Sequence, residues 1–227
     1  AAAGAGVAVV GRNADKNRQA AADLAGLGGP VEAFEADVAK EEAVEALVPR
    51  VRERLGRIDV LVNNAGINIR KAPQDYSLAE WREVLDTNLT SAFLLSRACY
   101  PAMKAQGGGK IINIGSMMSI FGASFAGPYA SSKGGIVQFT RATASAWARD
   151  NIQVNAVLPG WIDTDLTRRA RAQVPPLHDA ILARTPAGRW GGPDDMAGIA
   201  VFLASPASDF VTGTAIPVDG GYSIQGV

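Results

Sequence analysis

Cysteine and histidine are almost absent from this chain of 227 residues, which contains one of each. Cys99 has no partner for an intrachain disulfide, and we therefore expect a reducing, cytoplasmic location. Its apolar, helical-looking surroundings predict a small buried side chain. Because His178 stands alone and no cysteine cluster accompanies it, the ligand sets that bind zinc are excluded, and no metal site is predicted.

An excess of charge is also lacking. The chain has 22 basic and 22 acidic residues, a formal net charge of zero, and no block of basic residues. This balance argues against nucleic acid or an anionic membrane surface as the main partner. No apolar run approaches the roughly 18 residues needed to span a bilayer. The expected partner is therefore a small molecule.

Strand-like and helix-like segments alternate along the whole chain. Their alternation predicts a single α/β domain with a mostly parallel, doubly wound sheet, and the chain length suits one such domain. No internal linker or repeat divides it. The predicted strands are residues 7–10, 31–36, 58–62, 110–114, 152–158 and 214–218, and the predicted helices are residues 15–27, 40–55, 77–106, 129–150 and 194–203.

Tyr129 and Lys133 stand four residues apart, and Ser116 precedes Tyr129 by thirteen residues. On a helix, a spacing of four places the phenol and the ammonium group on one face. A neighbouring positive charge lowers a tyrosine pKa from about 10 and suits the tyrosine to acid–base catalysis near neutral pH. Taken alone, the pair is equally at home on a solvent-exposed helix.

Small polar residues and glycines follow three of the predicted strands. Asn63-Asn64-Ala65-Gly66 comes at the end of one, Ser116 follows the next, and Pro159-Gly160 follows a third. In open α/β sheets, ligands bind beyond the carboxyl ends of the strands. This placement favours a catalytic role for Tyr129 and Lys133, with transfer of a proton to or from an alcohol or ketone.

These motifs together resemble the short-chain dehydrogenase/reductase family over essentially the whole chain. The resemblance implies a Rossmann-like fold and a single dinucleotide-binding catalytic domain over residues 1–227. It rests on the order and spacing of Asn63-Asn64-Ala65-Gly66, Asn88, Ser116, Tyr129-Ala130-Ser131-Ser132-Lys133, Pro159-Gly160-Trp161-Ile162-Asp163-Thr164 and Val218-Asp219-Gly220-Gly221.

The resemblance also assigns catalytic roles. It implies that Tyr129 is the general acid in ketone reduction and the general base in alcohol oxidation. Lys133 would lower the tyrosine pKa and bind the nicotinamide ribose. Ser116 would hold the substrate oxygen, and Asn88 would fix a water that links Lys133 to solvent. Without the resemblance, Asn88 is equally a polar group that satisfies helix backbone, and Ser116 a turn-forming hydroxyl.

One family feature is missing from the sequence. Members carry a glycine-rich turn after their first strand, where the backbone approaches the cofactor pyrophosphate. Gly4 and Gly6 do not replace it, because they precede a strand instead of opening a helix. We therefore expect the natural protein to have a first strand and a glycine-rich turn before Ala1.

The resemblance places the cofactor along the strand ends. Asp37 would bind the adenine amine, although a helix N-cap is a compatible role for it. At the end of the strand 7–10 no acidic residue stands to bind a ribose 2′-hydroxyl, and Arg12 suits a 2′-phosphate, so NADP is preferred over NAD. The predicted cofactor contacts are Arg12, Asn13, Asp37, Val38, Asn64, Ala65, Gly66, Tyr129, Lys133, Pro159, Gly160, Ile162 and Thr164.

The substrate is expected beneath a variable loop at about residues 163–192. Its arginines and Arg70-Lys71 would suit a carboxylated substrate, although solvated surface charges explain them equally. The strongest resemblance is to gluconate-type sugar-acid dehydrogenases. The alternatives are a 3-oxoacyl-carrier-protein reductase and a catalytically idle nucleotide-binding scaffold. The resemblance also implies a homotetramer that associates through the helices 77–106 and 129–150.

Overall fold

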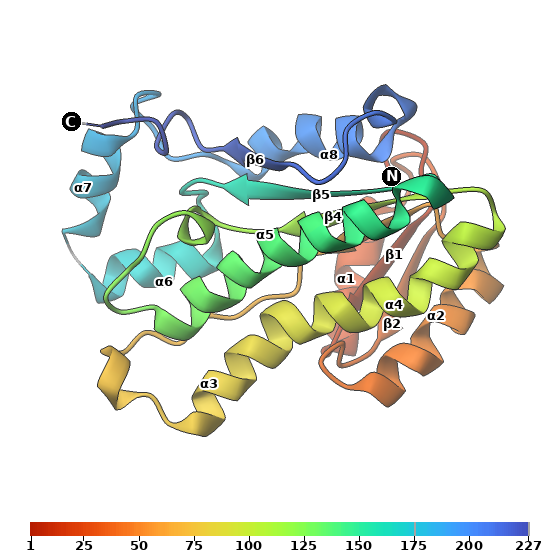
Figure 1. Cartoon of the computed structure of the whole chain (residues 1–227), viewed down its shortest axis with the longest axis horizontal. Coiled ribbons are helices and arrows are strands. Elements are labelled where there is room, and N and C mark those ends of the chain that lie inside the picture. Colours follow the sequence, from red (N-terminus) through yellow and green to blue (C-terminus); the bar gives the residue numbers. More distant parts are fainter. Residues whose placement is uncertain (175, 227) are drawn as a thin grey trace.

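The computed structural model describes residues 1–174 and 176–226 as an α/β fold in which every strand pairing is parallel. Strands β1 (Val7–Gly11) and β2 (Val31–Glu35) form one sheet. A second sheet has the order β3-β4-β5-β6. Its strands are Val60–Asn63, Gly109–Ile114, Ile152–Pro159 and Ala215–Val218. The predicted α/β class with a parallel sheet is confirmed (Figure 1).

The sheet is divided, since no described strand joins β1 to β3. Each of these two strands therefore has one edge without a described partner strand. Val62 of β3 is 49% exposed and Val10 of β1 is 37% exposed, which is unusual for apolar residues of a parallel sheet. In contrast, every residue of β5 from Ile152 to Leu158 is buried.

Helices cover both faces of the larger sheet. The described helices are α1 (Ala14–Leu24), α2 (Glu41–Leu55), α3 (Leu78–Leu85), α4 (Ser91–Ala105), α5 (Gly127–Trp147), α6 (Asp165–Gln173), α7 (Leu177–Arg184) and α8 (Ala197–Ala204). Of these, α4, α5 and α8 pack on the larger sheet, whereas α1 packs on β1 and β2. Successive strand residues point to opposite faces. Accordingly Ile111 of β4 packs beside Met103 of α4, whereas its neighbour Ile112 packs against Leu203 of α8. No helix of the described chain is long and apolar enough to cross a membrane.

The predicted helix 77–106 is present but is not uniform. Ser77 caps its start, and its side chain and that of Glu80 form a reciprocal capping box. The hydrogen bond from Lys71, together with those from Ser77, lowers the pKa of Glu80 to about 2. A π-helical turn at Asp86–Thr90 separates α3 from α4. This turn contains the buried Asn88, and such turns often occur at functional sites.

The segment 163–192 differs most from its prediction as a loop. Two helices, α6 and α7, form there. Thr164 begins α6, and its backbone N–H donates to the hydroxyl of Thr167. Among the arginines that suggested a polar loop, Arg168 forms an ion pair with Asp165 on the same helix. Helical pairs three residues apart satisfy these charges locally.

Candidate active site

The carboxyl ends of β3, β4 and β5 meet at a cavity of about 460 Å³. Asn64 and Gly66 reach it from the end of β3, and Ser116 from the end of β4. Pro159 and Gly160 reach it from the end of β5. The parallel register places Asn63 opposite Asn113 and Ile114 opposite Val157, so the three strands end side by side. The three polar segments predicted from the sequence therefore share one cavity.

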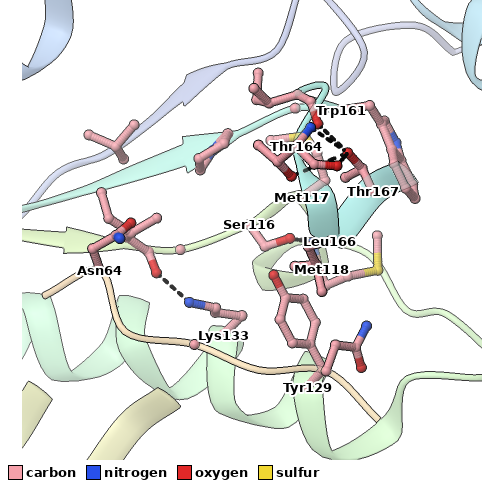
Figure 2. Close-up of a pocket in the computed structure, with 18 of the residues that line it drawn as sticks. Asn64, Ser116, Met117, Met118, Tyr129, Lys133, Trp161, Thr164, Leu166 and Thr167 are labelled. Carbon is pink, nitrogen blue, oxygen red and sulfur yellow. Dashed lines mark hydrogen bonds between the residues drawn. The ribbon is translucent and has the colours of Figure 1, made fainter. Parts of the chain in front are cut away.

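The first turns of α5 bring Tyr129 and Lys133 to the same cavity. Pro128 stands in the first turn of this helix, where a missing N–H costs nothing. Figure 2 shows the Tyr129 hydroxyl pointing toward that of Ser116. The Lys133 ammonium lies 5.7 Å from the centroid of the Tyr129 ring and donates a hydrogen bond of 2.6 Å to the Ile114 carbonyl oxygen.

Opposing effects act on the Tyr129 hydroxyl. Burial raises its pKa above the ordinary value of 10.0. The Ser116 hydroxyl and the positive charge of Arg70 act in the other direction. Lys133 was expected from the sequence to supply a positive charge near the phenol, and Arg70 is a second cation beside it.

Lys133 itself is buried, with 4% of its surface exposed. Burial lowers its pKa from 10.5 to about 8. At neutral pH this side chain still carries its proton, but it releases that proton more readily than a surface lysine. A lysine of this kind can both bind a ribose hydroxyl and pass on a proton.

Ser119 connects the backbones of two of these residues. Its hydroxyl donates to the Lys133 carbonyl oxygen at 2.7 Å and accepts from the Ser116 backbone N–H at 3.2 Å. The Ser116 side chain in turn accepts from the Met118 N–H at 3.1 Å. These bonds fix the turn that follows β4 against the first turns of α5.

Asn88 is 2% exposed and uses both ends of its carboxamide. The oxygen accepts from the Ile67 N–H at 2.8 Å, and the nitrogen donates to the Ile67 carbonyl oxygen at 3.0 Å and to Ser132 Oγ at 3.1 Å. Asn88 therefore satisfies the backbone of the loop after β3 and not that of its own helix. Its position ties that loop to α5, beside Lys133.

The predicted cofactor contacts fall into two places. Asn64, Gly66, Pro159, Gly160, Ile162 and Thr164 line the cavity with Ser116, Tyr129 and Lys133. Ala65 lies between two of these lining residues in the chain. Arg12 and Asp37 line a separate, open pocket of about 460 Å³ with Glu35, Ala36 and Arg50. Two pockets along one row of strand ends suit the two ends of an extended dinucleotide.

Asn13 and Asp37 also have local structural roles. The Asn13 side chain caps α1 by accepting from the Lys16 N–H at 2.9 Å. The N-cap of α2 is Lys40, so Asp37 is not the N-cap that the sequence suggested as an alternative. Its carboxylate instead accepts from the Ala39 N–H at 3.1 Å and fixes the turn, with Val38 inside it.

Gly160 fits the cavity because it has no side chain. A Cβ at this position would lie 2.6 Å from the Cα of Asp219, too close for any real contact. The Asp219 carboxylate accepts from the N–H groups of Gly221 and Ser223. The turn after β5 and the terminal Asp-Gly-Gly motif are therefore packed backbone to backbone, and a flat ring can lie along this wall.

Among the basic residues considered for the substrate mouth, Arg70 lines the cavity. Burial lowers its pKa, and the nearby Tyr129 and Tyr76 partly oppose that effect. The arginines of segment 163–192 are engaged elsewhere. Arg171 pairs with Asp163, and the Arg184 guanidinium lies 4.6 Å from the ring centroids of both Phe121 and Tyr222. Lys71 pairs with Glu80.

The sequence analysis missed several lining residues. Asn68, Met118, Phe125 and Leu166 all line the cavity, and Trp161 lines both it and a smaller neighbouring cavity. Of these residues, only Asn68 could have been found from the sequence, because it follows the predicted site residue Gly66 by two positions. The others depend on how the chain folds back over the cavity.

Comparisons with known proteins identify relatives of the whole chain. The family pattern described as enoyl-(acyl carrier protein) reductase matches residues 1–223. The chain is 42% identical over 220 residues to 2-dehydro-3-deoxy-D-gluconate 5-dehydrogenase of Formosa agariphila, covering 96% of this chain and 83% of that protein. It is 36% identical over 224 residues to gluconate 5-dehydrogenase of Gluconobacter oxydans, covering 98% of this chain and 86% of that protein.

A solved structure extends the similarity to three dimensions. The crystal structure of a gluconate 5-dehydrogenase from Burkholderia cenocepacia, in complex with NADP and tartrate, matches with a TM-score of 0.89 and 38% identity. The match covers 98% of this chain and 87% of that one. Fold, cavity and relatives define a nicotinamide-dependent oxidoreductase that acts on CH–OH groups. The chain belongs to the short-chain dehydrogenase/reductase family.

Proposed function

We propose that this protein interconverts a hydroxyl and a keto group of a sugar acid of the gluconate type, with Tyr129 as the acid–base residue. The observation that carries the proposal is the shared cavity, in which Tyr129, Ser116 and Lys133 stand beside the half-buried cation Arg70. The names of the relatives support the substrate class.

In alcohol oxidation, Ser116 and Tyr129 hold the substrate oxygen by hydrogen bonds. The Tyr129 phenolate takes the hydroxyl proton as the carbon–oxygen double bond forms. A nicotinamide held by the cavity residues would supply the hydride acceptor, so that the two electrons would leave the carbon as hydride and the proton would go to Tyr129. In ketone reduction Tyr129 returns its proton to the oxygen. Lys133 would hold the nicotinamide ribose and is the buried ammonium group that would return a proton to Tyr129.

Arg70 is the residue of the cavity that would bind the carboxylate of an acidic substrate. Its guanidinium lies in the wall with no carboxylate partner among the described residues, and its one side-chain bond is to Gln173 at 3.2 Å. An arginine in this setting binds a carboxylate through two parallel hydrogen bonds. The same charge faces Tyr129, so a bound carboxylate and the reacting hydroxyl would lie near each other.

Substrate profiling tests this proposal against the carrier-protein alternative. We expect NADP-dependent oxidation of gluconate, or reduction of its keto acids, at a kcat/KM at least tenfold above that for reducing an acetoacetyl thioester. The opposite order would favour a 3-oxoacyl-carrier-protein reductase. Cofactor binding without turnover of either substrate would favour an idle nucleotide-binding protein.

We further propose that NADP is preferred over NAD. Arg12 is exposed at the end of β1, and no described acidic side chain forms an ion pair with it. Arg50 lines the same pocket and has no described carboxylate partner, although Glu35 and Asp37 are present there as well. A free guanidinium at this strand end suits a ribose 2′-phosphate.

Replacing Arg12 tests the cofactor preference. An Arg12→Ala change should raise the KM for NADPH about tenfold and leave the KM for NADH almost unchanged, because NADH has no 2′-phosphate. Arg18→Ala is the matched control, since Arg18 is exposed on α1 and pairs with Asp15. An equal effect on both cofactors, or a lower wild-type KM for NADH, would overturn the preference.

We also propose a cytoplasmic homotetramer. Exposed apolar side chains occur on α4, with Phe93 at 42%, and on and after α8, with Val201 at 52% and Phe210 fully exposed. Patches of this kind mark association surfaces. Light scattering should give a mass about four times the 23.6 kDa of one chain, whereas a mass near that of one chain would contradict the proposal.

A further inference from the structure

Asn68 has an unusual environment for a polar side chain. It lies in the loop after β3, two residues beyond Gly66, and lines the same cavity as Arg70 and Tyr129. Its Oδ1 atom is buried and has no hydrogen-bond partner among the described residues. No described residue bonds its nitrogen either. Most buried polar side-chain atoms in proteins have at least one partner, so this carboxamide requires an explanation.

The contrast with neighbouring asparagines is clear. Asn88, which fixes the backbone of the same loop, uses both ends of its carboxamide in hydrogen bonds. Asn63, at the end of β3, also has a buried Oδ1 without a partner, but its nitrogen donates to Ser96 Oγ and Asn113 Oδ1. These two asparagines hold the protein together. Asn68 makes no such bond, so the fold gains nothing evident from its polarity.

We propose that Asn68 is a specificity-determining residue that hydrogen-bonds a hydroxyl group of the substrate. This inference rests on the proposed function and deepens it. A carboxamide offers a donor and an acceptor, and a half-turn of its terminal bond exchanges the end that faces the cavity. A hydroxyl can bond either end. Arg70 would take the carboxylate, so the two residues together select an acid that also carries a neighbouring hydroxyl.

A second cavity residue has a similar feature. The indole Nε1 of Trp161 is buried and unpartnered, and Trp161 lines the cavity from the turn after β5. Trp190 also has a buried, unpartnered Nε1, but it does not line this cavity. The two tryptophans pack edge to face at 5.8 Å. The Trp161 indole N–H, at the cavity, can therefore be compared with that of Trp190, which lies outside it.

Replacing Asn68 with a residue of similar size tests the inference. An Asn68→Leu change keeps the volume and removes both polar ends. If the carboxamide serves the substrate, the variant should melt at the same or a higher temperature, because a buried unpartnered atom is removed. Its kcat/KM for gluconate should fall 10- to 100-fold, and calorimetry should show weaker gluconate binding to the NADPH-loaded protein. The Kd for NADPH should not change.

Mono-deoxy analogues of gluconate identify the hydroxyl. For the analogue that lacks the contacted hydroxyl, wild type and Asn68→Leu should have nearly equal kcat/KM. For every other analogue, the kcat/KM of Asn68→Leu should be lower than that of wild type by the same factor as for gluconate. Trp190→Phe, which removes an unpartnered N–H outside the cavity, should leave the order of substrates unchanged.

Two results would overturn the inference. One is an equal loss of kcat/KM for every analogue together with a lower melting temperature, which would make Asn68 a structural residue. The other is an Asn68→Leu protein with unchanged selectivity. Either result counts against the inference only if the wild-type protein oxidises gluconate. A wild-type protein without activity on any sugar acid would instead contradict the proposed function.

Discussion

At the scale of single residues, part of the charge that favours ionisation of Tyr129 comes from an unexpected direction. The four-residue spacing correctly places Tyr129 and Lys133 together, because helical geometry fixes it. It does not show that Arg70 acts on the phenol while Lys133 bonds a backbone carbonyl oxygen. That arrangement depends on the path of the loop after β3, which no local sequence rule determines.

Removing the Arg70 charge should shift the pH dependence of alcohol oxidation. Tyr129 must lose its proton to act as the base, so the rate rises with pH up to its pKa. Since Arg70 lowers that pKa, an Arg70→Met change should move the rising limb to higher pH and should also weaken binding of carboxylated substrates. Rates for gluconate and for a neutral polyol between pH 6 and 11 measure both effects. If the rising limb of the pH–rate profile stays in place in Arg70→Met, Arg70 does not lower the pKa of Tyr129.

Lys133 makes a prediction about stability. Its folded pKa of about 8 is below its ordinary value of 10.5, so the unfolded chain binds more protons between these two pH values. The cost of burying the ammonium is complete below pH 8 and disappears as pH rises toward 10.5. The free energy of unfolding of Lys133→Met, measured with urea, should therefore gain relative to that of wild type by up to roughly 3 kcal/mol between pH 10.5 and pH 7, because only wild type bears the cost of the buried ammonium. A difference independent of pH would mean that Lys133 titrates like a surface lysine.

At the scale of elements, the turn after β4 and the start of α5 act as one unit through Ser119. Its hydroxyl bonds the backbones of Ser116 and Lys133, and small displacements of catalytic groups are costly. Ser119→Ala should lower kcat about tenfold while KM and NADPH binding stay near normal, and Ser119→Thr should restore most of the rate. Ser124→Ala is the control, because Ser124 is exposed in the same segment. If the two alanine variants behave alike, Ser119 does not position the site.

Elements with strong local signals were predictable, and those defined by tertiary contacts were not. The capping box at Ser77 predicted the start of a helix, and the apolar run of β5 predicted a strand. In contrast, α6 and α7 are polar, and their arginines gain stability from ion pairs and from contacts with aromatic rings far along the chain. The Arg171 guanidinium lies 4.5 Å from the ring centroid of Trp190, a contact that sequence spacing does not reveal.

At the scale of the whole molecule, the alternation of strands and helices was enough to predict a parallel α/β fold. It also predicted that chemistry would gather at the strand ends, because parallel strands end at one edge. The alternation could not give the strand order or the two helices that residues 163–192 form beside the cavity. Those features arise from packing between distant segments.

The account as a whole depends on proton transfer by Tyr129 to or from a sugar acid. The most direct measurement is NADP-dependent oxidation of gluconate by Tyr129→Phe and by wild type, followed by absorbance of the reduced cofactor, with NADPH binding measured in parallel. Phenylalanine keeps the ring and removes the proton, so kcat should fall by about 10²- to 10⁴-fold while NADPH binding remains. Near-normal turnover by the variant would contradict the mechanism.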